Sequence, residues 1–333
     1  MNKNSLLTPS DRTERDKTSY VLLPNKLLTD ALSLGILTVA VIALAFSPIF
    51  TKLSEIELSP TATIFNRLWI ATIIISSWQL IKTPAKFGLI APTESISDRQ
   101  EQGWLFLASL CATVSAVLWA MSLIHTSVAS STVLRSFTPI FISLGAWLIL
   151  KQSFNRQFII GMMLSIVGAI AIGWDDLQLG KDYLTGDGIA IVSAALHGAN
   201  ILIIGYLRDR GCTTEKVLLW RCASGALVVL PLCLTDTNLF PPSLQGWLTI
   251  VALAIVCQIF GQGLLVYSLK QFSSSFVGIF TLLKPLITAL LAWAIFAETI
   301  SIISGIALVL ILVGIYLAKS SDSSISARSA SAK

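Results

Sequence analysis

Long apolar segments constrain this chain more than any other feature. Each runs for about 20 residues, the length that an α-helix needs to cross the hydrocarbon core of a bilayer. Apolar and polar residues do not alternate strictly within them, which argues against a β-barrel. The sequence therefore predicts an all-α polytopic membrane protein with ten transmembrane helices. We expect these helices at 31–51, 61–81, 104–123, 128–150, 157–174, 187–206, 217–235, 247–268, 274–296 and 299–318.

The composition also indicates a lipid environment. Hydrophobic residues make up 54% of the chain and charged residues 12%, whereas a soluble domain carries about 25% charged residues. The net charge of +5 comes from basic residues in short loops, so we expect no nucleic-acid partner. The five cysteines form no CxxC motif and no cluster with histidine, which predicts no disulfide framework, metal site or other cofactor.

The distribution of lysine and arginine predicts the orientation. Cytoplasmic loops of membrane proteins are enriched in these residues. If the N-terminus is cytoplasmic, the cytoplasmic tails and loops hold seventeen of them and the external loops hold two, Lys52 and Lys181. We therefore expect an inner or plasma membrane protein with both tails, 1–30 and 319–333, in the cytoplasm. The Ser- and Ala-rich tail 319–333 is expected to be disordered.

The two halves of the sequence carry the same marker residues. The coinciding pairs are Pro139 and Pro285, Trp147 and Trp293, and Arg67 and Arg221. Unrelated apolar helices coincide often in Leu and Ile, but rarely in Pro, Trp and Arg. With five helices in each copy, the second copy must enter the bilayer from the opposite side. We therefore predict two inverted five-helix repeats, 31–174 and 187–318, an architecture that places a substrate site at the repeat interface.

Three segments resemble a known family. They are SPIFTKLSEIELSPTATIFNRLWIA in the first two expected helices, SFTPIFISLGAWLILKQ in the fourth, and LLKPLITALLAWAIFAETISIISG across the last two. Through them the chain resembles the EamA-type members of the drug/metabolite transporter superfamily. The resemblance implies a ten-helix carrier of small metabolites, often an exporter.

The family pattern is a Pro-centred helix that ends in Glu, followed by a Gly in the next helix. The second repeat has this pattern in Pro285, Glu298 and Gly305. The first repeat departs from it, because Gln152 stands at the Glu position and two extra residues precede Gly161. The two repeats are therefore expected to be related but not equivalent.

Four basic residues fall inside expected helices, where each central Lys or Arg costs about 2.5–3.5 kcal/mol. Arg67 and Arg221 lie near helix starts and can extend toward the membrane surface, so we assign them, with Glu298, a structural or gating role. Lys284 and Arg135 lie deeper and are expected to bind substrate, the alternative being hydrogen bonds that pack the helices.

Proline and further polar residues complete the predicted site. Pro139 and Pro285 are expected to kink the helices that carry Arg135 and Lys284. Polar side chains also recur at helical spacing on three other helices, where they line a substrate site or form interhelical hydrogen bonds. The residues predicted to join the site are Trp119, His197, Asn200, Gln258 and Gln262.

The function predicted from these features is secondary transport of a small polar metabolite, with efflux favoured. Membrane cations without a buried acid favour an anionic or zwitterionic substrate. His197 is the expected proton carrier if transport is coupled to protons. The alternatives are an intramembrane enzyme, for which HExxH and similar motifs are missing, and a non-transporting scaffold. The expected partners are the substrate and the lipid bilayer, and a homodimer is left open.

Overall fold

The computed structural model of the chain describes residues 30–82, 97–126, 128–172, 184–234, 236, 238–296 and 302–331. These residues form helices and turns and contain no strand. Residues 30–45 are helical and lead into α2. The further elements are α2 (Ser47–Ser54), α3 (Pro60–Lys82), α4 (Ser97–His125), α5 (Val128–Arg135), α6 (Thr138–Leu148), α7 (Arg156–Ile172), α8 (Leu184–Asp209), α9 (Thr214–Cys233), α10 (Leu244–Ala252), the π-helix η3 (Leu253–Gly261), α11 (Gln262–Ser268), α12 (Ser274–Phe280), α13 (Leu283–Phe296) and α14 (Ile302–Ser331).

Six helices of the described chain are long and apolar enough to cross a membrane. They are Asp30–Ser54, Pro60–Ile81, Arg99–Ser122, Leu184–Asp209, Thr214–Cys233 and Leu244–Ser268. Four shorter apolar helices are Val133–Leu148, Arg156–Ala171, Ser274–Thr288 and Gly305–Ser320. The all-helical membrane architecture is thereby confirmed, whereas the count of ten transmembrane helices stays a prediction.

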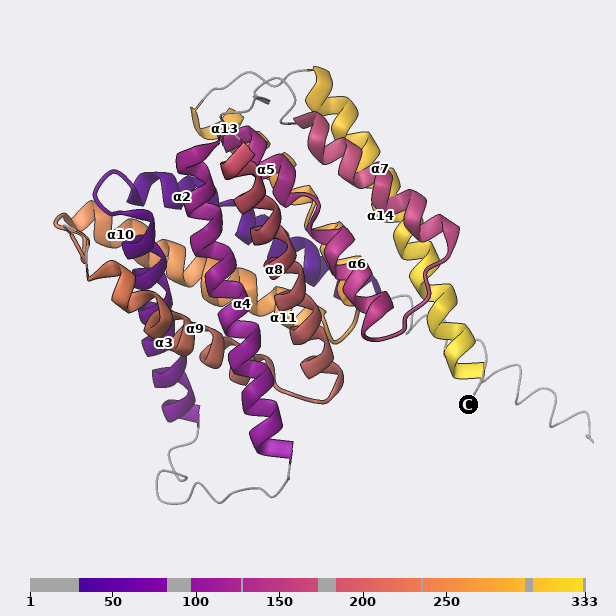
Figure 1. Ribbon diagram of the computed structural model, residues 1–333, viewed down its shortest axis with the longest axis horizontal. Coiled ribbons are helices and arrows are strands. Elements are labelled where there is room, and N and C mark those ends of the chain that lie inside the picture. The colour runs from indigo at the N-terminus through magenta and orange to yellow at the C-terminus, as the bar shows by residue number, and fades with distance from the viewer. Residues whose placement is uncertain are drawn as a thin grey trace, which may run out of the picture.

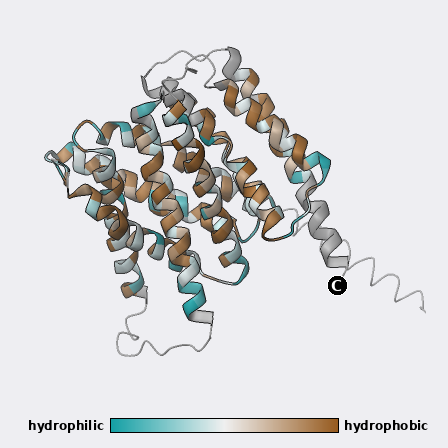
Figure 2. Cartoon of the chain, viewed as in Figure 1, coloured by the Kyte–Doolittle hydropathy of each residue, from teal (hydrophilic) through white to brown (hydrophobic). Residues whose placement is uncertain are grey.

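Large apolar side chains cover much of the outer surface of the helices. Leu227 is 70% exposed and Val309 is 58% exposed. Figure 2 shows hydrophobic residues running along the helices and hydrophilic residues gathered near helix ends. Because so much exposed apolar surface is unfavourable in water, lipid is the solvent that this surface fits.

Each of the two predicted proline kinks coincides with a complete break in a helix. The break between α5 and α6 directly precedes Pro139, which is the second residue of α6, and the break between α12 and α13 precedes Pro285, the third residue of α13. Proline lacks an N–H and clashes with the carbonyl four residues earlier, but it fits the first turn of a helix. Each break therefore leaves the start of a new helix inside the apolar region.

Helices α7 and α14 lie side by side at one edge of the molecule (Figure 1) and approach closely through small residues. A Cβ atom added to Gly161 would lie 2.5 Å from the carbonyl oxygen of Gly314, and one added to Gly168 would lie 2.9 Å from that of Ala307. Gly168 and Gly314 are 146 positions apart, and so are Gly161 and Ala307. The contacts are thus reciprocal, with the same offset that relates Pro139 to Pro285.

This packing corrects the expected equivalence of Gly161 and Gly305. A Cβ atom on Gly305 would meet no atom of the described residues within 4 Å, and Gly305 is exposed. The position that matches Gly161 is Ala307, so the offset of 146 continues into α14 without two extra residues. The sequence pattern matched Gly161 to the glycine at position 305, but alanine is also small enough for a close helix crossing.

The disorder expected of the tail 319–333 stays a prediction. Helix α14 continues to Ser331, beyond Lys319. Adding a residue to an existing helix is much easier than starting one. The apolar part of α14 therefore supports helix in residues that would not start one alone.

Two carboxylates connect segments that are far apart in the sequence. Asp236 accepts hydrogen bonds from Ser59 Oγ at 2.6 Å and from Thr61 Oγ1 at 2.7 Å, at the start of α3. Glu57 accepts a short hydrogen bond from the hydroxyl of Ser243, the N-cap of α10. Each carboxylate lies at a helix N-terminus, where the helix dipole favours negative charge. We call these five residues the carboxylate clasp.

Candidate functional site

A small polar cavity lies between segments from distant parts of the chain. Its volume is about 20 Å³, enough for one or two water molecules and too small for a metabolite. Four apolar residues form part of the wall: Leu44, Ile201, Ile204 and Leu265. The polar lining residues are His197 and Asn200 of α8, Arg221 of α9, Gln262 of α11, and Thr281 and Lys284 at the break between α12 and α13.

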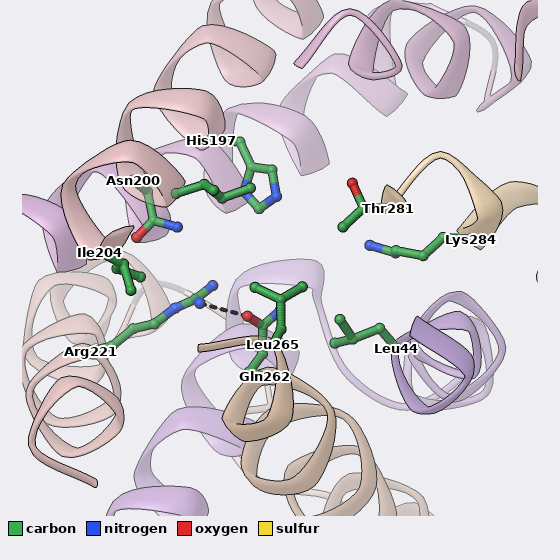
Figure 3. A pocket seen from close by; sticks show the side chains of 10 residues that line it. Leu44, His197, Asn200, Ile204, Arg221, Gln262, Leu265, Thr281 and Lys284 are labelled. Carbon is green, nitrogen blue, oxygen red and sulfur yellow. Dashed lines mark hydrogen bonds between the residues drawn. The ribbon is translucent and has the colours of Figure 1, made fainter. Parts of the chain in front are cut away.

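Two cations face each other across this cavity. Figure 3 shows the guanidinium of Arg221 and the ammonium of Lys284 extending into it from opposite walls. Arg221 Nη1 donates a hydrogen bond to Gln262 Oε1 at 2.7 Å. Lys284 is the second residue of α13, so the positive end of that helix dipole adds to its field. The cavity is therefore strongly attractive to negative charge.

His197 and Asn200 line the α8 side of the cavity, as the sequence predicts for the site (Figure 3). Asn200 is almost fully buried, and its Oδ1 has no hydrogen-bond partner among the described residues. Buried polar atoms without a partner are rare in native proteins and indicate a missing water or ligand. Ser193, one turn before His197, instead packs the helices, because Ser115 Oγ donates to its carbonyl oxygen at 2.8 Å.

The predicted pair Gln258 and Gln262 is separated by the structure. Gln262 lines the cavity, whereas Gln258 is buried and donates to Cys222 Sγ at 3.4 Å. Residues four apart share a face in an α-helix, but Gln258 lies within the π-helix η3, which is wound differently, and Gln262 is the first residue of α11. Gln258 is therefore not a lining residue of this cavity.

Arg135 and Trp119 lie beside the cavity rather than in its wall. The Arg135 guanidinium carbon is 5.2 Å from the centroid of the Trp119 ring, and Arg135 Nη1 donates to Ser193 Oγ at 3.2 Å. The buried Trp119 Nε1 has no partner in the described part of the chain. Arg135 is nevertheless close enough to Lys284 to repel it electrostatically. The two predicted cations thus belong to one charged region.

The structure places Arg67 and Arg221 in the interior, which corrects the expectation that they extend to the membrane surface. Arg67 Nε is buried without a hydrogen-bond partner among the described residues, and Arg67 interacts electrostatically with Arg221 and Lys284. The segment that contains Leu239 packs over the start of α3, since Asn66 donates to the carbonyl oxygen of Leu239 at 2.7 Å. Glu298, the third residue expected to have a gating role, lies outside the described residues.

Thr281 is a lining residue that the sequence reasoning missed. It is the C-cap residue that follows α12 and donates to the carbonyl oxygen of Gly278 at 2.7 Å. The repeat offset of 146 relates Thr281 to Arg135, which was predicted for the site. Applying the offset to every predicted site residue would have identified it.

The four interior cations have no described carboxylate beside them. None of the residues lining the cavity is acidic, and no described Asp or Glu forms an ion pair with Arg67, Arg135, Arg221 or Lys284. At about 2.5–3.5 kcal/mol for each central cation, the four would cost on the order of 10–14 kcal/mol if all were central. Ionisable residues inside a membrane protein typically mark a substrate pathway.

These features define the class: a multi-pass helical membrane protein that encloses a polar, cationic cavity. A family model described as the EamA-like transporter family matches residues 32–174 and again residues 184–319. The chain belongs to the EamA-like transporter family, and thereby to the drug/metabolite transporter superfamily.

Relatives are similar along much of the chain. An "Uncharacterized transporter" of Archaeoglobus fulgidus is 24% identical over 290 residues, 85% of this chain and 95% of the relative. "Uncharacterized transporter YetK" of Bacillus subtilis is 21% identical over 218 residues, 64% of each chain. A solved structure titled "Crystal structure of protein" has a TM-score of 0.72 at 17% identity, covering 86% of this chain and 97% of that one, which shows a shared fold.

Proposed function

We propose that the chain is a secondary transporter that carries a small anionic or zwitterionic metabolite, in the direction of efflux. The observation that carries this proposal is the cavity flanked by Arg221 and Lys284, whose described lining includes no acidic residue. Its walls combine Leu44 with residues of α8 to α13, so both regions matched by the family contribute to it. A substrate at such an interface would contact both halves of the protein.

The proposed architecture is ten transmembrane helices in two inverted repeats, 31–174 and 187–318. The reciprocal contacts between α7 and α14 support it, because a two-fold relation between repeats requires such pairs. The distribution of lysine and arginine favours cytoplasmic termini in an inner or plasma membrane. A homodimer stays a prediction.

The proposed mechanism is alternating access. The cavity is too small for a metabolite, so one side must open before the substrate enters. An anionic group would then lie between Arg221 and Lys284 and reduce their repulsion. Closure around the neutralised pair, followed by opening of the other side, would move the substrate across. The carboxylate clasp is suited to hold one side closed, since it connects residues 57–61 to residues 236–243.

Transport by purified protein in liposomes is the test. We expect Lys284→Gln to reduce counterflow of a labelled substrate at least tenfold, because a hydrogen bond to a charged group contributes about 1.5–3 kcal/mol. Lys270→Gln, at an exposed position between α11 and α12, is the matched control and should retain transport. An intramembrane enzyme or a scaffold would move nothing, and that result would overturn the proposal.

A further inference from the structure

The interior carries more positive charge than its described residues neutralise. Arg67, Arg135, Arg221 and Lys284 are close enough to repel one another. The hydrogen bonds of Arg135 and Arg221 go to a neutral serine and a neutral glutamine. Arg67 Nε is buried without a hydrogen-bond partner among the described residues, and no described Asp or Glu forms an ion pair with Lys284. A molecule that brings negative charge into the cavity would neutralise part of this charge.

The cations at the two helix breaks occupy different positions. Arg135 and Thr281 each stand four residues before the proline of their break, whereas Thr138 and Lys284 stand directly before it. Each break thus supplies one cation and one threonine, in opposite order. Relative to the prolines, the positions of the two cations differ by three residues. The two cations therefore do not coincide under the repeat relation, and they can hold two separate anionic groups.

Hydrogen-bond donors around the site also outnumber acceptors. Trp119 Nε1 and Arg67 Nε are buried donors without a partner among the described residues, and the Lys284 ammonium is a further donor in the cavity wall. The unpartnered buried acceptor on the cavity wall is Asn200 Oδ1. A ligand that satisfies this surface must bring several acceptor oxygens. Carboxylate and phosphate groups are the biological groups that do so.

We propose that the substrate is a compact polyanion with at least two negative charges, a dicarboxylate or a phosphate ester. One anionic group lies between Arg221 and Lys284 (Figure 3), and the second lies at Arg135 and the indole N–H of Trp119. This inference rests on the proposed transport function. An amino acid would bring an ammonium group among four cations, and a monocarboxylate would neutralise one of them.

Counterflow in proteoliposomes with five labelled probes tests the proposal. The probes are succinate, glycerol 3-phosphate, lactate, alanine and choline. We expect succinate or glycerol 3-phosphate to exchange at least ten times faster than the other three. Faster exchange of alanine, lactate or choline would overturn the polyanion proposal and leave transport itself supported. If none of the five probes moves and none shifts the melting temperature of the purified protein, both proposals fail.

Two substitutions test the second anionic group. Arg135→Gln should lower the affinity for the preferred dianion about ten times more than it lowers the affinity for lactate, because lactate does not reach that position. Trp119→Phe keeps the ring beneath Arg135 and removes the N–H, so a loss of about threefold, again specific to the dianion, is expected. Equal losses for dianion and lactate, or no loss, would overturn the two-group arrangement. Unchanged melting temperature and elution volume establish that each variant is folded, and Lys270→Gln is the unaffected control.

Discussion

Asp236 accepts a hydrogen bond from Ser59 at 2.6 Å, although 177 positions separate the two residues. The same carboxylate accepts from Thr61, and Glu57 in turn binds Ser243 at the start of α10. The first region matched by the family thus contributes the carboxylate of Glu57 to the second region, and the second contributes the carboxylate of Asp236 to the first. An interaction of this kind stabilises one conformation without touching the cavity.

Removing the clasp should open the side of the protein that it holds. Asp236→Ala deletes two hydrogen bonds to a charged group, each contributing about 1.5–3 kcal/mol. We expect a several-fold faster alkylation of a reporter cysteine introduced at Leu44, which lines the cavity. Asp209→Asn, at an exposed position at the end of α8, is the control and should leave the rate unchanged. An unchanged rate in Asp236→Ala would mean that the clasp does not restrict access.

A methyl group added at Gly314 should destabilise the crossing of α7 and α14. A Cβ there would overlap the carbonyl oxygen of Gly161, so the two backbones must separate. Overpacking of this kind costs about 1–3 kcal/mol, and we expect Gly314→Ala to lower the melting temperature in detergent by several degrees. Gly305→Ala, on the same helix with open space around its Cβ, should change it little. Equal melting temperatures for the two variants would contradict the crossing.

Cys212 should react slowly with thiol reagents in the folded protein. Burial, with a hydrogen bond to Glu101, raises the pKa of this thiol, which lies between α8 and α9, from 9.0 to about 12. A higher pKa means less thiolate, the reactive form, at every pH below it. At pH 8 we expect alkylation by maleimide to be slow in the native state and complete after denaturation in SDS. Mass spectrometry of the Cys212 peptide measures both.

Glu101→Gln provides the check on that cause. It removes the negative charge that disfavours the thiolate, so the pKa of Cys212 should fall and the alkylation rate at pH 8 should rise. If burial alone raised the pKa of Cys212, the alkylation rate of Glu101→Gln would stay as low as that of the natural protein.

His197 lines the cavity and is the histidine predicted to carry a proton if transport is proton-coupled. On that hypothesis, His197→Gln should remove the dependence of transport on an imposed pH gradient while substrate binding is retained. Uptake should be measured between pH 5.5 and 8, the range in which histidine ordinarily changes charge. The same pH dependence in the variant and the natural protein would remove His197 as the carrier.

Gln262 orients Arg221 through the 2.7 Å hydrogen bond between them. Gln262→Ala should leave the guanidinium mobile and weaken substrate binding about three- to tenfold, in line with the 0.5–1.5 kcal/mol of a typical hydrogen bond. Gln262→Glu should weaken it much more, because the added carboxylate would pair with Arg221 in place of substrate. Calorimetric titration of the purified protein distinguishes these outcomes. Similar affinities in both variants would contradict an anionic substrate.

The sequence by itself determined the membrane-spanning, all-helical class and the family, because both depend on local properties. Twenty apolar residues have few options other than a helix in lipid. Proline interrupts a helix wherever it falls in the interior, and the breaks before Pro139 and Pro285 are where the sequence predicts kinks. The participation of Lys284, His197 and Asn200 in one cavity was also predicted, because polar groups deep in apolar helices must find a shared interior.

Only the tertiary structure decided which polar residues meet. Arg221 was assigned to the membrane surface from its distance to a helix start, yet its side chain lines the cavity. Gln258 lies within the π-helix η3 and no longer shares a face with Gln262, and no local sequence pattern predicts that change of winding. The pairing of Gly161 with Ala307 and of Asp236 with Ser59 depends on how distant helices pack. Sequence periodicity reports which face of a helix is polar, but the neighbour of that face is set by packing across the whole chain.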